Sequence, residues 1–277
     1  MKPFFSIVIP TLNEEKFLPK LLESLGKQTF KNFEVIVVDG KSEDQTVAVA
    51  REFLDKANRI NKTNRMKILT SSKRNVGYQR NLGARQAKGD YLVFFDADVT
   101  VEQNFLKKVY QHIKKEESLL MTTWLLPDSH ETIDELFVLL TNYAIELARY
   151  TKKAILPGFN IVVERNTFWA IGGFDERIKH AEDIDFAQKA RKKGLSPRFL
   201  KEPLLTISLR RFRREGRIEV LRKYSKSLTY LLFKGPITRD LFDYPMGGEY
   251  HLEKKKTHPF KTLKKKWHPF FQLLFPR

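Results

Sequence analysis

The chain contains no cysteine among its 277 residues. It therefore has no disulfide, no thiolate nucleophile and no cysteine-ligated metal, which is consistent with a reducing compartment. Long apolar runs are also missing: the longest stretch without a charged residue is 3–13, well below the ~18 residues that a membrane-spanning helix needs. The first residues offer one lysine, a short apolar run and no small-residue cleavage site. We therefore expect no secretory signal and a cytoplasmic location.

Acidic residues are the minority charge, with 33 Asp and Glu against 51 Lys and Arg and a net charge of +18. Residues 201–277 hold 19 basic and 7 acidic residues, so two thirds of the excess lies in this last part. Such a field attracts polyanions, namely nucleic acid, an anionic membrane surface or phosphorylated ligands. Hydrophobic residues make up 42% of the chain, a globular composition that excludes disorder over most of its length.

Apolar runs alternate with amphipathic stretches over most of the chain. The runs are 4–10, 33–39, 66–70, 91–96, 119–126 and 160–164. Apolar residues at helical spacing predict helices at 17–26, 47–54, 79–87, 105–115, 129–150, 184–193 and 218–233, and a short one ending at 171. Ser42 with Gln45 and Thr100 with Gln103 are candidate helix caps. The alternation predicts an α/β fold: an open, twisted sheet of parallel strands with helices on its faces.

Carboxylates lie at the ends of two predicted strands. Asp39 is the last residue of 33–39, Asp96 is the last residue of 91–96, and Asp98 follows two residues later. Open parallel sheets bind ligands beyond the carboxyl ends of their strands. The alternating pair Asp96-Ala97-Asp98 offers hard oxygen ligands, which suit Mg²⁺ or Mn²⁺ held together with substrate phosphates. A D-x-D tripeptide alone is equally compatible with aspartates that cap a helix or close a turn.

Six motifs in this chain resemble those of family 2 glycosyltransferases, in the family's order. They are 4–15 (FFSIVIPTLNEE), 35–46 (VIVVDGKSEDQT), 74–84 (RNVGYQRNLGA), 89–98 (GDYLVFFDAD), 172–176 (GGFDE) and 182–186 (EDIDF). The resemblance implies a GT-A fold with a mixed, mainly parallel sheet. It also implies a nucleotide-diphosphate sugar as donor (a UDP-, GDP- or dTDP-sugar), a divalent metal, Mg or Mn, and transfer with inversion at the anomeric carbon.

The resemblance also implies a division of the chain. Residues 1–210 would form the catalytic domain, with the nucleotide-sugar-binding half at 1–125 and the acceptor half at 126–210. Residues 211–277 would form a basic, aromatic and helical C-terminal extension.

Donor binding is implied for residues at the ends of the predicted strands and on one helix, namely Pro10, Thr11, Asn13, Glu14, Asp39, Gly77, Arg80, Asn81, Asp96, Ala97 and Asp98. Asp39 would accept a hydrogen bond from the base. Asp98 would bind the metal directly, and Asp96 would lie nearer the ribose or hold the metal through water. A glycine at 77 permits close backbone approach, and Arg80 would offset phosphate charge. A solvated helix face is the alternative for Arg80.

The family's general base corresponds to Asp183, and Glu182 beside it would raise the pKa of Asp183. From the residues alone, this pair is the acidic first turn of a helix. Gly158, Asn160, Glu182 and Asp183 are the expected acceptor-side residues. Trp169 is a further acceptor-side candidate, although core packing is its expected role. Many relatives supply a further metal or diphosphate contact from a late residue. The candidates here are Arg210, Arg211, Arg213 and Arg214.

Processive members of the family carry Gln-x-x-Arg-Trp, which is missing here, so we expect a single addition to a hydroxyl acceptor. In the tail, aromatic and aliphatic residues are interleaved with lysines: Phe260, Leu263, Trp267, Phe270, Phe271 and Leu274 with Lys261, Lys264, Lys265 and Lys266. This pattern fits the inner face of an anionic membrane and a lipid-linked acceptor or cell-envelope glycan precursor. It fits equally a cover over the catalytic domain or a partner chain.

A non-catalytic basic protein that binds nucleic acid or anionic membrane is the alternative function. It explains the basic tail but leaves the acidic motifs unused, so we expect no specific binding of nucleic acid. A dinucleotide oxidoreductase is disfavoured because no GxGxxG follows the first strand. A sugar nucleotidyltransferase is disfavoured because its Gly-rich, Lys-bearing signature is missing between Pro10 and Glu15.

Overall fold

The computed structural model describes residues 2–61, 65–148, 150, 154–239, 241–242 and 247–248. The strands in these residues are β1 (Phe5–Thr11), β2 (Phe33–Asp39), β3 (Met66–Thr70), β4 (Tyr91–Phe95), β5 (Thr100–Val101), β6 (Leu120–Pro127), β7 (Asn160–Glu164) and β8 (Arg198–Ile207). The helices are α1 (Leu18–Gly26), α2 (Thr46–Asn61), α3 (Val76–Gln86), α4 (Phe105–Glu116), α5 (Thr132–Ala148), α6 (Arg165–Ile171), α7 (Glu182–Lys192), α8 (Arg210–Glu215) and α9 (Arg217–Lys234).

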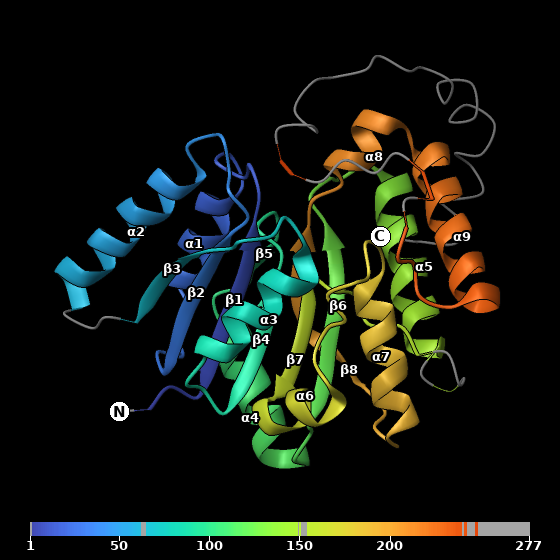
Figure 1. Cartoon of the computed structure of the whole chain (residues 1–277). Coiled ribbons are helices and arrows are strands. Elements are labelled where there is room, and N and C mark those ends of the chain that lie inside the picture. The colour runs from blue at the N-terminus through green and yellow to red at the C-terminus, as the bar shows by residue number, and fades with distance from the viewer. Residues whose placement is uncertain are drawn as a thin grey trace.

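The described strands form one sheet in the order β3-β2-β1-β4-β7-β6-β8-β5 (Figure 1). Strands β3, β2, β1 and β4 are mutually parallel, whereas β7 pairs antiparallel with β4, and Phe95 lies opposite Asn160. The carboxyl end of β4 therefore meets the amino end of β7. Residues that follow β4 and residues that precede β7 lie at the same edge of the sheet. The expected mixed, mainly parallel sheet is confirmed.

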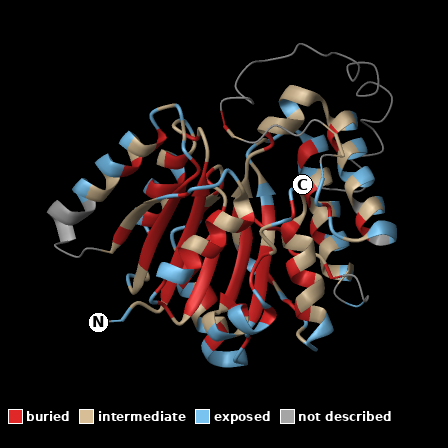
Figure 2. Cartoon of the chain, in the orientation of Figure 1, coloured by how far each residue is buried: buried red, intermediate tan, exposed pale blue. Residues whose placement is uncertain are grey.

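Helices cover both faces of the sheet, and alternate residues of β1 show how. Phe5, Ile7 and Ile9 are buried against one group of helices, α1, α2, α4 and α5. Val8 points to the opposite face, which α3, α6 and α7 cover. Figure 2 shows the strands buried almost throughout between these two layers. The period of two along each strand thus creates two separate cores.

Both predicted helix caps are wrong, because longer-range contacts replace them. Helix α2 begins at Thr46, and the Ser42 hydroxyl instead donates to Asp39 Oδ1 at 2.5 Å. Thr100 pairs with Thr206 in the β5–β8 ladder. The first turn of α4 is satisfied by Gln28, whose Oε1 accepts from the Leu106 N–H at 3.0 Å.

The sequence patterns did not predict β5 or β8. Lys201, Glu202 and Pro203 interrupt the apolar alternation of β8, and its register with β6 shifts between Thr123 and Leu125. An irregular strand of this kind is defined by its pairing partner rather than by its own pattern.

None of the described helices is both long and apolar enough to cross a membrane. The tail residues singled out in the sequence, from Phe260 to Leu274, lie outside the described residues.

Candidate functional site

The predicted site residues gather at one edge of the sheet. The carboxyl ends of β1, β2 and β4, the amino end of β7 and the first turn of α7 meet there. They bring together 10–14, 39–46, 96–98, 158–160 and 182–183. Two arginines complete the edge, one from α3 and one from the start of α8. Motifs far apart in the sequence thus converge where an open α/β sheet binds ligands.

The loops after β1 and β2 are joined by short hydrogen bonds around Asp39. Its carboxylate, 2% exposed, accepts from the Ser42 N–H at 3.0 Å and from the Thr11 hydroxyl at 3.3 Å. The Asn13 N–H donates to Ser42 Oγ at 2.9 Å, and Asn13 Oδ1 accepts from the Glu43 N–H at 2.8 Å. Asn13 adopts a φ of +52°, which residues other than glycine rarely do. Local strain of this kind concentrates at functional sites.

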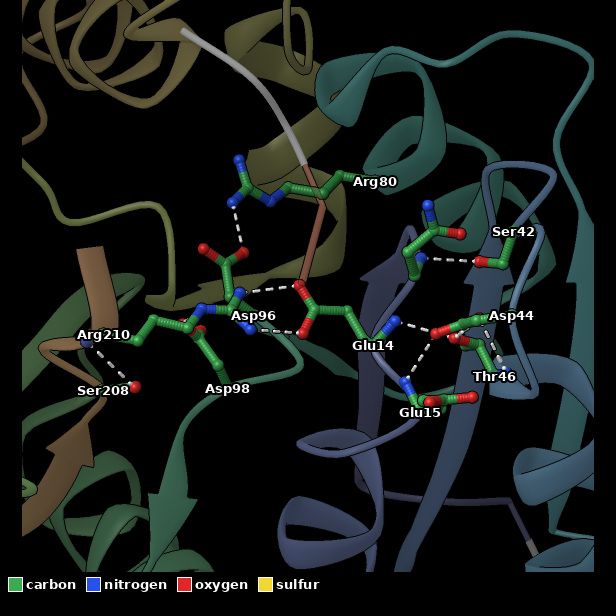
Figure 3. Close-up of polar contacts among 11 residues, drawn as sticks. Glu14, Glu15, Ser42, Asp44, Thr46, Arg80, Asp96, Asp98, Ser208 and Arg210 are labelled. Carbon is green, nitrogen blue, oxygen red and sulfur yellow. Dashed lines mark hydrogen bonds and ion pairs between the residues drawn. The ribbon is translucent and has the colours of Figure 1, made fainter. Parts of the chain in front are cut away.

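The buried carboxylate of Glu14 is held by an arginine from the other half of the chain (Figure 3). Arg210 donates to both oxygens of Glu14 at 2.7 Å, and its Nε lies 3.1 Å from Asp98 Oδ2. Its guanidinium carbon also lies 4.3 Å from the centre of the Phe17 ring. Burial raises the pKa of Glu14 to about 7, although the hydrogen bonds from Arg210 lower it. The bidentate pair fixes the start of α8 against the loop after β1.

Arg210 is thus the late arginine that the structure brings to Glu14 and Asp98. Arg213 instead makes a bidentate pair with Asp128, and Arg211 lies 3.3 Å from Glu215 on its own helix. The sequence spacing contained no signal for this choice. Residues 14 and 210 are 196 positions apart, and the contact depends on β8, which the sequence did not predict.

Arg80 is buried rather than solvated, so the solvated-face alternative is wrong. Its side chain is 2% exposed, and its guanidinium joins two carboxylates from opposite halves of the site. Nη2 lies 2.8 Å from Asp96 Oδ1, and Nη1 lies 2.5 Å from Glu182 Oε1. The guanidinium also lies over the Phe174 ring, with 5.3 Å to its centre. Removing one partner of such a buried pair leaves an uncompensated charge, which is strongly destabilising.

The Asp183 carboxylate is held by two backbone N–H groups. Gly158 donates to Oδ2 at 2.7 Å and Ile184 donates to Oδ1 at 2.8 Å. Burial and the neighbouring charge of Glu182 raise the pKa of Asp183 to about 7, while Arg80 and the two N–H groups lower it. Helix α7 begins at Glu182 after Ala181, whose φ is +61°. Asp183 thus lies in a first helical turn and has a carboxyl group whose pKa is raised to the neutral range, and its role as the base stays a prediction.

The position of Gly158 leaves no room for a side chain. A Cβ atom there would lie 2.9 Å from Arg80 Nη2 and 2.9 Å from Asp183 Oδ2. These two groups therefore approach the backbone as closely as a glycine allows. Two residues on, the Asn160 amide donates to Thr123 O at 3.1 Å and to Thr123 Oγ1 at 2.9 Å, which ties β7 to β6.

Asn81 and Gly77 both face the 173–176 turn. Asn81 donates to Phe174 O at 2.8 Å and accepts from the Phe174 N–H at 3.0 Å. A Cβ on Gly77 would lie 3.4 Å from that of Phe174. These contacts place the GGFDE motif against α3, and a direct contact of Asn81 or Gly77 with the donor stays a prediction. The expectation for Trp169 is wrong, because it is 39% exposed.

Asp96 and Asp98 offer a plausible donor set for a divalent cation. Their carboxylates, 36% and 20% exposed, are hard oxygen ligands two residues apart at the end of β4. In the part of the chain that the structure describes, no three His, Cys, Asp or Glu side chains come together as a metal cage. A cation that keeps waters and binds substrate phosphates needs one or two protein carboxylates. The residues present therefore fit Mg²⁺ or Mn²⁺ bound together with a diphosphate.

Comparison with known proteins identifies the family. The sequence model of Glycosyl transferase family 2 matches residues 6–172. A protein of Haemophilus influenzae described as an uncharacterized glycosyltransferase is 31% identical over 206 residues, which are 72% of this chain and 66% of that protein. The poly(ribitol-phosphate) beta-N-acetylglucosaminyltransferase TarS of Staphylococcus aureus is 30% identical over 199 residues, 67% of this chain and 32% of that protein. The chain belongs to glycosyl transferase family 2, and the resemblance seen in its motifs is confirmed.

A more similar but shorter match is a Methanococcus voltae protein. The name of that protein is dolichyl N-acetyl-alpha-D-glucosaminyl phosphate 3-beta-D-2,3-diacetamido-2,3-dideoxy-beta-D-glucuronosyltransferase. It is 43% identical over 122 residues, 42% of this chain and 37% of that protein. The chain thus spans between about a third and two thirds of the length of these relatives.

Solved structures confirm the GT-A fold. The structure of S. aureus TarS residues 1–349 with UDP-GlcNAc superposes with a TM-score of 0.60 at 26% identity, over 75% of this chain and 58% of that one. The mannosyltransferase PcManGT of Pyrobaculum calidifontis, solved with GDP-Man and Mn²⁺, gives 0.62 at 18% identity, over 83% of this chain and 65% of that one. Because PcManGT is 18% identical to this chain, its similarity shows the fold alone.

Proposed function

We propose that the protein is an inverting, metal-dependent glycosyltransferase that moves a single sugar from a nucleotide-diphosphate sugar to a hydroxyl acceptor. One observation carries the proposal. The half-buried carboxylate of Asp183 is held by the Gly158 N–H at 2.7 Å at the same sheet edge as Asp96 and Asp98. In this arrangement Asp183 would serve as the base, and a metal held by Asp96 and Asp98 would neutralise the charge of the leaving group, the two requirements of the reaction.

On the donor side, the loops after β1 and β2 would bind the nucleotide, with Asp39 at the base. Asp98 and Asp96 would hold the divalent metal, which supplies positive charge to the departing diphosphate when bound. Arg210 lies beside Asp98 and adds a fixed positive charge there. Pro10, Thr11, Asn13, Glu14, Gly77, Arg80, Asn81 and Ala97 stay the other proposed donor-side residues.

On the acceptor side, Asp183 would accept the proton of the attacking hydroxyl at one of its carboxylate oxygens. The hydroxyl oxygen forms the new bond to the anomeric carbon as the bond to the diphosphate breaks on the opposite face, so the configuration inverts. Arg80 neutralises Glu182, and therefore the negative charge next to Asp183 is partly compensated. Gly158 fixes the direction in which the base points.

Two relatives guide the choice of substrates. A UDP-sugar is the first donor to test, because the TarS structure that is 26% identical to this chain contains UDP-GlcNAc. The name of the Methanococcus relative specifies a dolichyl-linked sugar phosphate, which supports a lipid-linked or cell-envelope acceptor. Such an acceptor would place the enzyme at the inner face of the membrane. The missing Gln-x-x-Arg-Trp motif supports single addition.

We expect a UDP-sugar with Mn²⁺ or Mg²⁺ to raise the melting temperature by several degrees. A ligand at a hundred times its Kd stabilises the folded state by about 2.7 kcal/mol, and each kcal/mol shifts the Tm of a chain this size by about 2–4 °C. The measurement is a thermal-shift screen of UDP-, GDP-, dTDP- and CDP-sugars with each metal or EDTA. Asp98→Asn should lose the metal-dependent part of the shift, whereas Asp90→Asn, at an exposed carboxylate paired with Lys2, should keep it.

If no donor shifts the Tm with either metal, the proposal fails. Strong, salt-sensitive binding to nucleic acid or lipid in the same experiment would favour the non-catalytic alternative, because it would use the net charge of +18 without the acidic motifs.

The rate of transfer should rise with pH through about 7. Asp183 must be ionised to accept a proton, and burial with the charge of Glu182 raises its pKa to about 7. About one tenth of the carboxyls are then ionised at pH 6, so kcat/KM should fall about tenfold for each pH unit below 7. The measurement is a pH profile of kcat/KM in buffers of constant ionic strength. A flat profile between pH 5 and 8 would contradict the role of Asp183.

A further inference from the structure

Helix α5 carries an apolar stripe on its exposed face. Ile133, Leu140, Tyr143 and Leu147 are spaced by three, four or seven residues and are between 39% and 64% exposed. This spacing places them on one side of the helix. The opposite side is buried through Val138 and Asn142. A surface helix normally presents polar residues to water, so a continuous exposed apolar stripe marks an interaction site.

Helix α9 adds a second exposed apolar set beside the first. Its members are Ile218, Leu221, Tyr224 and Phe233, and Phe233 is 82% exposed. The two helices lie at the same end of the molecule (Figure 1). Arg217 at the start of α9 lies 2.8 Å from Asp134 of α5, and Phe212 of α8 packs on Phe137 of α5 with 4.9 Å between ring centres. We call the eight exposed apolar residues of both helices the α5–α9 surface.

Basic residues predominate on the α9 side of this apolar surface, whereas α5 carries Asp134, Glu135 and Glu146 and no basic residue. Residues 210–239 contain ten basic and two acidic residues, a net charge of +8. Arg222, Lys226 and Lys234 of α9 are exposed among the apolar positions. Several of the other arginines are engaged with carboxylates, Arg210 with Glu14 and Arg213 with Asp128. An exposed apolar face interleaved with cations is typical of helices that lie in the interface of an anionic membrane.

Charge decides between the possible occupants of the α5–α9 surface. Residues 132–148 and 210–239, which form the surface, together have ten basic and five acidic residues, a net charge of +5. A second copy of the chain would bring +5 against +5, and the tail at 249–277, with eight basic and two acidic residues, has the same sign. Both contacts are therefore electrostatically unfavourable. Nucleic acid would satisfy the lysines and arginines but would leave Leu140, Leu147 and Ile218 exposed to water. An anionic lipid surface satisfies both the charge and the apolar side chains.

We propose that the α5–α9 surface docks the enzyme on an anionic lipid surface, with its aliphatic and aromatic side chains in the headgroup region. Helix α8 begins at Arg210, which contacts Glu14 and Asp98, and leads directly into α9. Docking therefore fixes the position of the site relative to the membrane. The inference rests on the proposed function, because docking would give access to a lipid-linked acceptor. The surface is inferred from the exposed side chains of α5 and α9.

The test is flotation of the full-length protein with vesicles of phosphatidylcholine containing about one quarter phosphatidylglycerol. The variant combines Leu140→Gln, Leu147→Gln, Ile218→Gln and Phe233→Gln. These changes replace exposed apolar side chains by a polar residue that is compatible with a helix. We expect its vesicle affinity to fall at least about tenfold, and that of the wild type to fall with salt and in pure phosphatidylcholine. The control is Leu119→Gln with Trp169→Gln, which removes two apolar residues that lie elsewhere and are 42% and 39% exposed; it should bind as the wild type does.

Two further measurements separate a loss of membrane docking from a loss of donor binding. A second variant, Lys226→Gln with Lys234→Gln, removes two positive charges, together with the hydrogen bond from Lys226 to Leu241 O at 2.9 Å. It should weaken binding to anionic vesicles with at most a small change in Tm. The UDP-sugar thermal shift of each variant reports the donor site, so loss of docking with a normal shift supports the surface, and loss of the shift concerns the proposed function instead. The proposal is overturned if the quadruple variant floats like the wild type, or if Trp267→Gln with Phe270→Gln in the tail is the sole change that abolishes flotation.

Discussion

Replacing Asp183 by Asn should lower kcat for sugar transfer by about 10²–10⁴-fold, the usual contribution of a general base. The amide keeps the shape of the side chain and can still accept from the Gly158 N–H, now at 2.7 Å from Oδ2. It cannot take the proton of the acceptor hydroxyl. Donor binding should stay within about twofold, because the proposed donor residues lie on other elements. Initial rates at saturating donor and the donor-induced thermal shift measure the two effects.

Asp185→Asn is the matched control for this variant. It makes the same change two residues further along α7, where the carboxylate pairs with Lys189 at 3.2 Å. Its rate should stay close to that of the wild type. Full activity of Asp183→Asn, or an equal loss in both variants, would disprove the assignment of Asp183 as the base.

Gly158→Ala should reduce transfer by about 10²-fold, because it displaces the base and its neighbour together. The new Cβ would lie 2.9 Å from both Asp183 Oδ2 and Arg80 Nη2, distances that real contacts do not show. Displacement of a reacting group by about 1 Å costs about this much in rate, and overpacking costs about 1–3 kcal/mol of stability. Steady-state rates and urea unfolding of the purified variant measure these two effects.

Gly26→Ala provides the control, since a Cβ at the end of α1 meets nothing within 4 Å. That variant should keep its activity and its stability. If Gly158→Ala is as active as Gly26→Ala, the Gly158 backbone does not position the base, and Asp183 would have to act in another orientation.

Much of the donor half follows from the sequence, since its strands are buried on both faces and its motifs end those strands. Val35–Asp39 is an uninterrupted apolar run closed by an aspartate, and a parallel sheet necessarily places that aspartate beside the end of β1. The pairing of Thr11 with Asp39 is a consequence of this register. Here the apolar run in the sequence and the parallel pairing of the strands favour the same position for Asp39, so its place in the fold can be predicted from the sequence.

The rest depends on contacts that no local pattern contains. The first turn of α4 is capped by Gln28. The contact of Arg210 with Glu14 depends on the irregular strand β8, which precedes Arg210 in the chain. Arg80 illustrates the difficulty well. Its neighbours on α3 do not distinguish a solvated arginine from a buried one, and its partners, Asp96 and Glu182, become adjacent only once β7 pairs antiparallel with β4.

That antiparallel pairing also bears on how the family diversifies. In the described sheet, backbone hydrogen bonds of β4 with β7 and of β5 with β8 join residues 1–125 to residues 126–210, and such bonds do not depend on side-chain identity. Side-chain contacts across the two parts are both apolar and charged. Phe94 packs on Phe168 and Phe174, while Arg80 pairs with Glu182 and Arg210 with Glu14. A chimera with residues 126–210 of another member would thus need to conserve both these complementary charges and the apolar side chains of the shared cores. We therefore expect such a chimera to fold only where both the apolar packing and the ion pairs across this pairing are matched.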